Sequence, residues 1–248
     1  MSDAVETANA SPALPPITSS LIIQEAVALF EGTLGRTAHV WLIILVLNIV
    51  ERLAPLIPLP YHGAWVPIAL LSEAYAQGAA TRGLLRDRMG LWVPNRDFGL
   101  YLGTSLLLIL PTAGAVAIVG LLFRSFTLGL LLAVPVAVLM LQYYLWPIGL
   151  LIGYDKMTAA ESARLMNGRI TSLIGALLQV FLVLAIPFAL FLFAAFDLGG
   201  STAWTYAEQV VRAIFYAGRG IAATAILAAM YKLTADRAEV PSGTTPAR

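Results

Sequence analysis

Residues 172–196 read SLIGALLQVFLVLAIPFALFLFAAF, and none of these side chains is charged. A helix needs about 20 mostly apolar residues to cross the roughly 30 Å hydrocarbon layer of a membrane. The whole chain has the same character, since 59% of its residues are hydrophobic and only 12% are charged. Its mean hydropathy is +0.83. One soluble core of this size could not bury so many apolar stretches, so the sequence predicts an integral membrane protein.

Six stretches of this kind are long enough to cross a membrane as helices. They cover residues 37–57, 64–85, 98–123, 128–154, 172–196 and 205–233. Helices are expected because lipid offers the backbone no hydrogen-bond partners, and because the stretches lack the alternation of barrel strands. We therefore predict an all-α, polytopic membrane protein. It is a bundle of six transmembrane helices with two cytoplasmic-side surface helices.

The chain divides into one membrane domain and two polar tails. Residues 1–19 are rich in Ala, Ser and Pro, and we expect a disordered N-terminal tail there. Residues 20–233 form the six-helix domain with its preceding amphipathic helix, and residues 234–248 form a disordered C-terminal tail. The chain has no cysteine, which excludes disulfides and thiolate metal sites. A net charge of +1 gives no reason to expect a nucleic-acid partner.

The basic residues are distributed unevenly between the two sides of the predicted bundle. Cytoplasmic loops of membrane proteins carry an excess of Lys and Arg. Of the fifteen basic residues, Arg52 and Arg124 fall on one side, and Arg212 and Arg219 fall within the sixth span. The other eleven share the side of both termini: Arg36, Arg82, Arg86, Arg88, Arg96, Lys156, Arg164, Arg169, Lys232, Arg237 and Arg248. We expect a multi-pass protein of the bacterial inner (cytoplasmic) membrane with cytoplasmic N and C termini.

Two segments that precede spans on this side share a pattern. Residues 25–32 read EAVALFEG and residues 161–168 read ESARLMNG, so Glu, Leu and Gly match at an offset of 136. Residues 22–34 place apolar side chains on one helical face, and Thr158 with Glu161 forms a capping box. We predict that both segments lie along the inner membrane surface, with apolar faces at the headgroup boundary. Alternatively, the similarity arises by chance and each segment simply leads into its span.

A family resemblance rests on the second of these segments and on the number of spans. The stretch AESARLMNGR at residues 160–169, the surface helix and the six spans resemble the YciC-like group. They also resemble the membrane domain attached to some bacterial glycerophosphodiester phosphodiesterases. The resemblance covers most of the chain and implies a six-helix inner-membrane module without established catalytic residues. No soluble segment here is long enough to hold the phosphodiesterase catalytic domain.

Seven polar residues stand out within the predicted spans, where a charged group costs about 2.5–3.5 kcal/mol on insertion scales. They are Glu51, Arg52, Glu73, Gln77, Glu208, Arg212 and Arg219. Glu208 is spaced to pair with Arg212 at i, i+4. Glu73 is a second candidate partner, because Glu73 and Arg212 both lie roughly 12 Å from the outer surface at about 1.5 Å per residue. These groups either lock the bundle, the interpretation we favour, or line a polar path between the first, second and sixth spans.

No pattern in the chain predicts catalysis, a cofactor or a metal site. The zinc-protease, phosphate-loop and nucleophile-elbow motifs are missing, and the loops leave little room for a soluble active site. We therefore expect a non-enzymatic accessory subunit or scaffold that organises other membrane components. The alternative is a small secondary transporter or channel with a polar path around Glu73, Arg212 and Arg219. Expected partners are the lipid bilayer and either another membrane protein or further copies of the chain.

Overall fold

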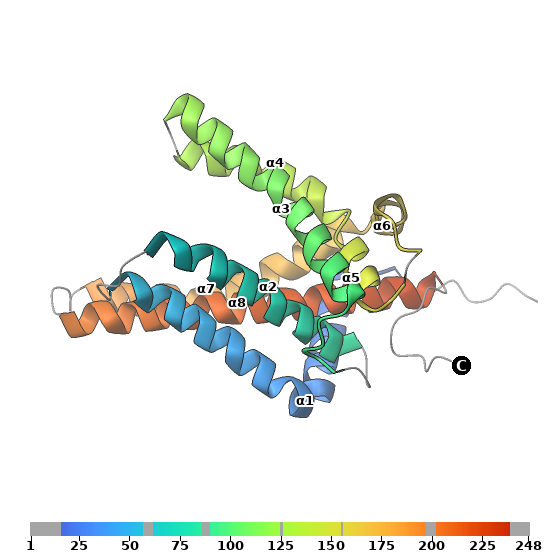
Figure 1. Ribbon diagram of the computed structural model, residues 1–248, viewed down its shortest axis with the longest axis horizontal. Coiled ribbons are helices and arrows are strands. Elements are labelled where there is room, and N and C mark those ends of the chain that lie inside the picture. The colour runs from blue at the N-terminus through green and yellow to red at the C-terminus, as the bar shows by residue number, and fades with distance from the viewer. Residues whose placement is uncertain are drawn as a thin grey trace, which may run out of the picture.

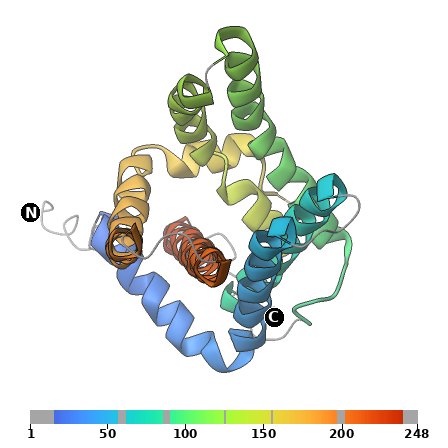
Figure 2. The ribbon, with the colours of Figure 1, turned by 90° about the vertical axis from the view of Figure 1, so that its left-hand side faces the viewer.

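The computed structural model describes residues 16–56, 62–85, 90–124, 126–154, 156–196 and 202–238. Every regular element within these ranges is helical, in agreement with the predicted all-α class. Four helices form the main group: α1 (Ser19–Leu53), α2 (His62–Leu85), α7 (Ile170–Phe196) and α8 (Thr202–Arg237). Both α1 and α8 contact each of the other three helices, and α8 lies in the middle of the group (Figures 1 and 2).

The centre of the core is a single stretch of α8. Residues 224–231 read TAILAAMY, and all eight are buried. A helix buried on every side must be surrounded by other helices, and the small Ala225, Ala228 and Ala229 let those neighbours approach closely. The position of α8 therefore follows from an alanine-rich sequence in its C-terminal half.

The predicted surface helix and the first predicted span form one continuous helix, α1. It begins at Ser19, where the side chain of Thr18 accepts the N–H of Leu21. Figure 2 shows that its first part runs across the end of the bundle before α1 turns along it. Residues 32–37 contain two glycines and two threonines, and Thr33 and Thr37 donate to the carbonyls of Leu29 and Thr33. Such back-bonding bends helices, as small residues also do.

Part of the apolar face of the first part of α1 packs on protein where we expected lipid headgroups, whereas Val27 and Leu34 on this segment are exposed. Ile22, Ala26 and Leu29 are buried in the core shared with α7 and α8. The hydroxyl of Ser19 donates to the carbonyl of Ser172 at the start of α7, at 2.9 Å. The reason is that this face meets two helix ends that would otherwise expose their own apolar side chains.

Two further helices form a hairpin that projects from the main group. They are α3 (Arg96–Phe123) and α4 (Phe126–Leu141), joined through Arg124 in a left-handed conformation with φ of 50°. A Cβ added to Gly129 of α4 would lie 2.9 Å from the carbonyl oxygen of Val116, so the two backbones approach closely. The hairpin reaches the rest of the molecule through α2 and through α5 (Leu145–Leu151) (Figures 1 and 2).

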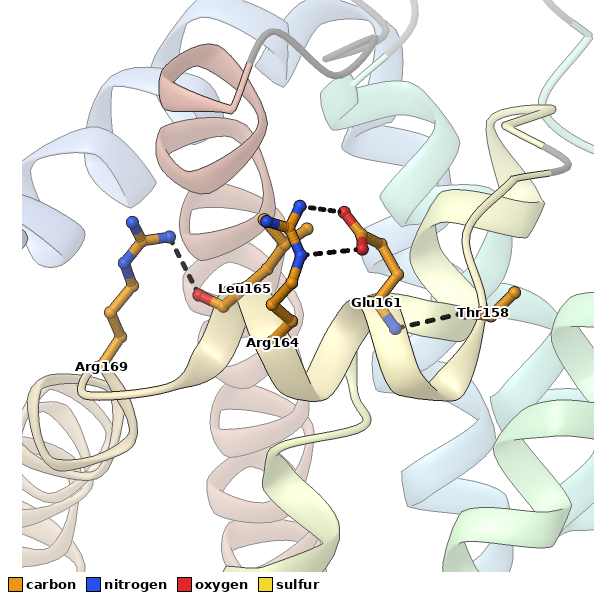
Figure 3. A network of polar contacts seen from close by, with 5 residues as sticks. All are labelled: Thr158, Glu161, Arg164, Leu165 and Arg169. Atoms are coloured by element: carbon orange, nitrogen blue, oxygen red, sulfur yellow. Dashed lines mark hydrogen bonds and ion pairs between the residues drawn. The ribbon is translucent and has the colours of Figure 1, made fainter.

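The predicted fourth span, 128–154, is broken in the structure. The axes of α4 and α5 differ by 48°. Pro147 has no N–H for the carbonyl of Tyr143, which accepts instead from the N–H of Trp146 at 3.1 Å. The carbonyl of Gln142, freed by the same break, accepts the hydroxyl of Ser162 at 2.9 Å. Ser162 belongs to the short helix α6 (Ala159–Met166), which is the second predicted surface helix (Figure 3). α6 therefore supplies a hydrogen bond to the carbonyl that the break leaves free.

Length and composition alone mark four helices as able to cross a membrane. They are residues 19–53, 96–122, 170–193 and 204–237, and the bent pair α4–α5 makes a fifth if it counts as one span. α2, the expected second span, is not among them. It carries Glu73 and Gln77 within its apolar stretch, and these lower its mean hydropathy. The structure therefore supports a helical membrane protein, while the number of six spans stays a prediction.

The structure describes only a small part of the two predicted tails. Residues 1–15 and 239–248 lie outside the described residues, and so does most of each predicted tail. α8 continues to Arg237, four residues beyond the predicted end of the membrane domain at 233. Thr234 and Ala235 are buried there, which explains why the helix does not stop earlier.

Candidate functional site

A group of polar side chains lies where α1, α2 and α8 meet. We call it the polar cluster, and it consists of Asn48, Glu51, Arg52, Glu73, Gln77, Tyr216 and Arg219. Its centre is the carboxylate of Glu73, which accepts from the Nε2 of Gln77 at 3.2 Å, one turn along α2. From α1, the side chains of Asn48 and Glu51 also interact with this carboxylate, and Arg219 does so from α8.

Gly220 makes room for the centre of the polar cluster on the α8 side. A Cβ added there would lie 3.6 Å from both the Glu73 Oε1 and the Gln77 Nε2, which is ordinary van der Waals contact. A larger side chain would push the carboxylate and the amide away from α8. Gly220 therefore allows α2 and α8 to approach with a polar pair between them.

Two arginines lie against one aromatic ring at the edge of the polar cluster. The guanidinium carbon of Arg52 is 4.1 Å from the ring centroid of Tyr216, and that of Arg219 is 4.9 Å from the same centroid. Both distances fit cation–π contacts, which are worth about 0.5–2 kcal/mol each. Glu51 and Glu73 are acidic and the two arginines are basic, so the formal charge of the polar cluster is zero. The ring of Tyr216 thus links α1 to α8 without a direct ion pair.

The predicted candidates separate into two groups in the structure. Glu51, Arg52, Glu73, Gln77 and Arg219 all belong to the polar cluster. Glu208 and Arg212 form their own pair on α8, with the Arg212 Nη2 2.6 Å and its Nε 2.8 Å from the Glu208 Oε1. The i, i+4 spacing on one helix brings these two groups together.

The alternative pairing of Arg212 with Glu73 is wrong. Glu73 faces α8 at Gly220, two turns beyond Arg212, or roughly 12 Å along the helix axis at 1.5 Å per residue. Counting depth from the ends of spans misplaced the two residues, because such a count leaves out how α2 and α8 are shifted and rotated relative to each other. Among the described residues that act on Glu73, the cation is Arg219.

The chemistry open to the polar cluster is limited. Within the described ranges, no three His, Asp or Glu side chains lie close enough together to hold a metal ion. The cluster contains one carboxylate that two amides engage, and no imidazole that could activate a nucleophile is among its members. Its side chains, apart from the buried Asn48, are half-buried or exposed. This arrangement can fix three helices relative to one another, or it can offer a carboxylate and a guanidinium to a small polar solute.

A second polar site, at the other end of α2, was not predicted from the sequence. Arg82 is completely buried, and its Nη1 donates to the carbonyl of Val93 at 2.7 Å. Its Nη2 donates to the Oδ1 of Asn95, the residue whose side chain also caps α3 by accepting the N–H of Phe98 at 3.0 Å. The guanidinium carbon lies 4.8 Å from the centroid of the Phe98 ring. The charge pattern had marked Arg82 only as a cytoplasmic cation.

An aromatic group extends this second site towards α1. The hydroxyl of Tyr75 donates to the carbonyl of Trp92, and the two rings stack with centroids 5.9 Å apart. The indole N–H of Trp92 donates to the Nε2 of His39 on α1 at 3.1 Å. The loop before α3 is therefore tied to both α1 and α2. Asn95 precedes the apolar run of α3, and this pattern could have predicted that its side chain caps the helix.

Comparisons with protein-family models, with curated proteins and with solved structures gave no match for this chain.

Proposed function

We propose that this chain is a non-enzymatic accessory subunit or scaffold of the bacterial inner membrane. The observation that carries the proposal is the α3–α4 hairpin, which projects from the main group and exposes apolar side chains along its length (Figure 1). The members of the polar cluster, by contrast, interact with one another and connect α1, α2 and α8. The surface is therefore suited to contact with other membrane components, and the polar interior to stability.

One face of α3 is especially suited to a partner helix. Gly99, Gly103, Leu106, Leu110, Ala113, Ala117 and Leu121 are all exposed and recur at intervals of three or four residues. A Cβ added at Gly99 or Gly103 would meet nothing within 4 Å. Helices pack closely in membranes where small residues line the contact, and this face holds two pairs spaced by four residues. α3 also packs against α4 and α5.

A partner on α3 can be tested by photo-crosslinking in intact cells. A photoreactive residue at Leu110 should give a discrete crosslinked protein species, either a second copy of the chain or another membrane protein. The control position is Leu182 on α7, which is equally exposed (63% against 61% for Leu110) but lies on a helix packed against α8. Crosslinks to lipid alone at both positions would refute the docking role of the hairpin.

The proposed topology has six spans with both termini in the cytoplasm. It rests on eleven basic residues on one side against two on the other. Reporter fusions after Arg96, Arg169 and Arg248 should report the cytoplasm, and fusions after His62 and Gly200 should report the periplasm. A periplasmic signal from the fusion after Arg248 would contradict the topology. The resemblance to the YciC-like group, which implies the same six-helix module, forms part of this proposal.

The second candidate is a small transporter or channel, and the polar cluster is the observation that favours it. The half-buried Glu73 and the exposed Arg219 could together hold a small polar solute or pass a proton. Glu73→Gln distinguishes the two functions. In a transporter, the change abolishes solute movement while the thermal unfolding midpoint stays the same. In a scaffold, neither form moves solute, and Glu73→Ala, which removes the acceptor that Gln77 and Asn48 engage, lowers stability by about 1–3 kcal/mol.

A further inference from the structure

The loop formed by residues 90–95, which leads into α3, is tied to α1 by a hydrogen bond between two rings. The Nε1 of Trp92 lies 3.1 Å from the Nε2 of His39, and the centroids of the two rings are 6.0 Å apart. An indole N–H can only donate, so the imidazole nitrogen that it meets must carry a lone pair. His39 is therefore neutral in this contact, with its proton on Nδ1.

The imidazole of His39 is exposed and makes no ion pair in the described part of the chain. The titratable and charged groups of the surrounding elements are Arg36 on α1, Tyr75 and Arg82 on α2, and Arg96 and Asp97 at the start of α3. Tyr75 and Arg82 bind carbonyls of the 90–95 loop, and Asp97 accepts from Asn95 at 3.4 Å, so these bonds do not involve the imidazole. The charged start of α3 places the contact at a polar end of the hairpin, where protons can reach it.

A second proton on His39 removes the acceptor of this bond. Both ring nitrogens of an imidazolium carry hydrogen and can only donate, so the indole N–H of Trp92 would face another N–H. Imidazoles in proteins generally change charge between about pH 5 and 8. The bond is therefore present at neutral pH and is lost as the pH falls.

We propose that the contact between His39 and Trp92 is a pH-sensitive tie, which holds the 90–95 loop to α1 at neutral pH and releases it in acid. Tyr75 and Arg82 keep the loop on α2 in both states, so acid loosens only the side that faces α1. Because the loop leads into α3, the tie sets how firmly the base of the α3–α4 hairpin is held. This regulation goes beyond the proposed function and does not depend on it, since the tie is the same in a scaffold and in a transporter.

Hydrogen exchange of the full chain in detergent tests the tie, read by mass spectrometry on peptides that cover residues 90–98. The matched variant is His39→Gln, because the amide oxygen of a glutamine can accept the indole N–H at every pH. At pH 7.5 the two chains should exchange at the same rate. At pH 5.5 the wild-type loop should exchange about two- to tenfold faster than that of the variant, as the loss of one hydrogen bond predicts. Comparing the chains at one pH cancels the intrinsic pH dependence of exchange.

Two further variants complete the experiment. His39→Phe keeps a ring without an acceptor, so it should exchange faster than the wild type at pH 7.5 and match it at pH 5.5. This comparison still tests the tie if His39→Gln does not fold. His62→Gln removes the other of the two histidines in the chain and should leave the pH response unchanged.

Equal exchange of the wild-type chain and His39→Gln at pH 5.5 would overturn the proposal, because protonation would then release nothing. The same conclusion would follow if His39→Phe exchanged like the wild type at pH 7.5, since the loop would then be held without the imidazole.

Discussion

Replacing Arg82 with alanine should lower the free energy of unfolding by about 3–5 kcal/mol, a large loss for a single substitution. The side chain is fully buried, and two of its nitrogens bind Val93 and Asn95. Hydrogen bonds to charged groups are worth about 1.5–3 kcal/mol each, and the contact with the Phe98 ring adds about 1 kcal/mol. The truncation also leaves a cavity and an unmet carbonyl where α2 meets the start of α3.

Thermal unfolding in detergent is the measurement for this prediction, and the midpoint should fall by roughly 10 °C. The control is Arg96→Ala, because Arg96 is exposed one residue after the cap and should change the free energy by less than about 0.5 kcal/mol. Arg82→Lys should recover part of the loss, since a lysine keeps the charge but cannot bind two acceptors in fixed directions. If Arg82→Ala unfolds at the wild-type temperature, the guanidinium contributes nothing to the packing of α2 on α3.

The second large effect is expected from Gly78→Ala on α2, at about 2 kcal/mol of destabilisation, within the range of about 1–3 kcal/mol that overpacking of a filled core typically costs. A Cβ at this position would lie 2.8 Å from ring atoms of both Phe98 and Tyr101. Both rings are buried, and Phe98 also packs at 4.5 Å between centroids against Tyr75, so neither can move aside freely. Thermal unfolding in detergent measures this loss as well.

The matched control for this change is Gly103→Ala on α3, where an added Cβ meets nothing within 4 Å. Alanine is the better helix former, so this variant should be neutral or more stable by up to about 1 kcal/mol. Comparing the two variants separates steric conflict from helix propensity, since both exchange glycine for alanine inside a helix. An unchanged stability of Gly78→Ala would contradict the close packing of α2 against Phe98 and Tyr101, and a loss for Gly103→Ala would contradict the open surroundings of Gly103.

Much of the helical framework could be predicted from local sequence. The capping box at Thr158 and Glu161 predicted the start of α6, because a side-chain oxygen and a backbone N–H three residues apart need no tertiary context. The apolar run at 172–196 predicted α7 with an error of two residues at its start. The break between α4 and α5 could not be predicted in this way. Its cost is offset by Ser162, twenty residues further along the chain, and periodicity carries no information about such a contact.

The polar cluster shows where sequence reasoning ends. The spacing of Glu208 and Arg212 identified their pairing, because both residues are on one helix. The partner of Glu73 depends on how α1, α2 and α8 are rotated and shifted relative to one another. The sequence of a single helix determines neither the rotation nor the shift. Glu73 and Gln77 lie against α8 at Gly220, but a glycine in a membrane helix has many possible roles.

The contacts of α1 also determine the order in which this protein can be completed. α1 is synthesised first, yet the side chains that match its polar residues belong largely to α8, and Glu25 is paired with a lysine 207 positions away. Between the end of α1 at Leu53 and the start of α8 at Thr202, the ribosome must add 149 residues (202 − 53). At about 5–20 residues per second this takes on the order of ten seconds or more. During that time Arg52 lacks the ring of Tyr216 and Glu25 lacks Lys232, so these contacts of the first helix form only after α8 has been made.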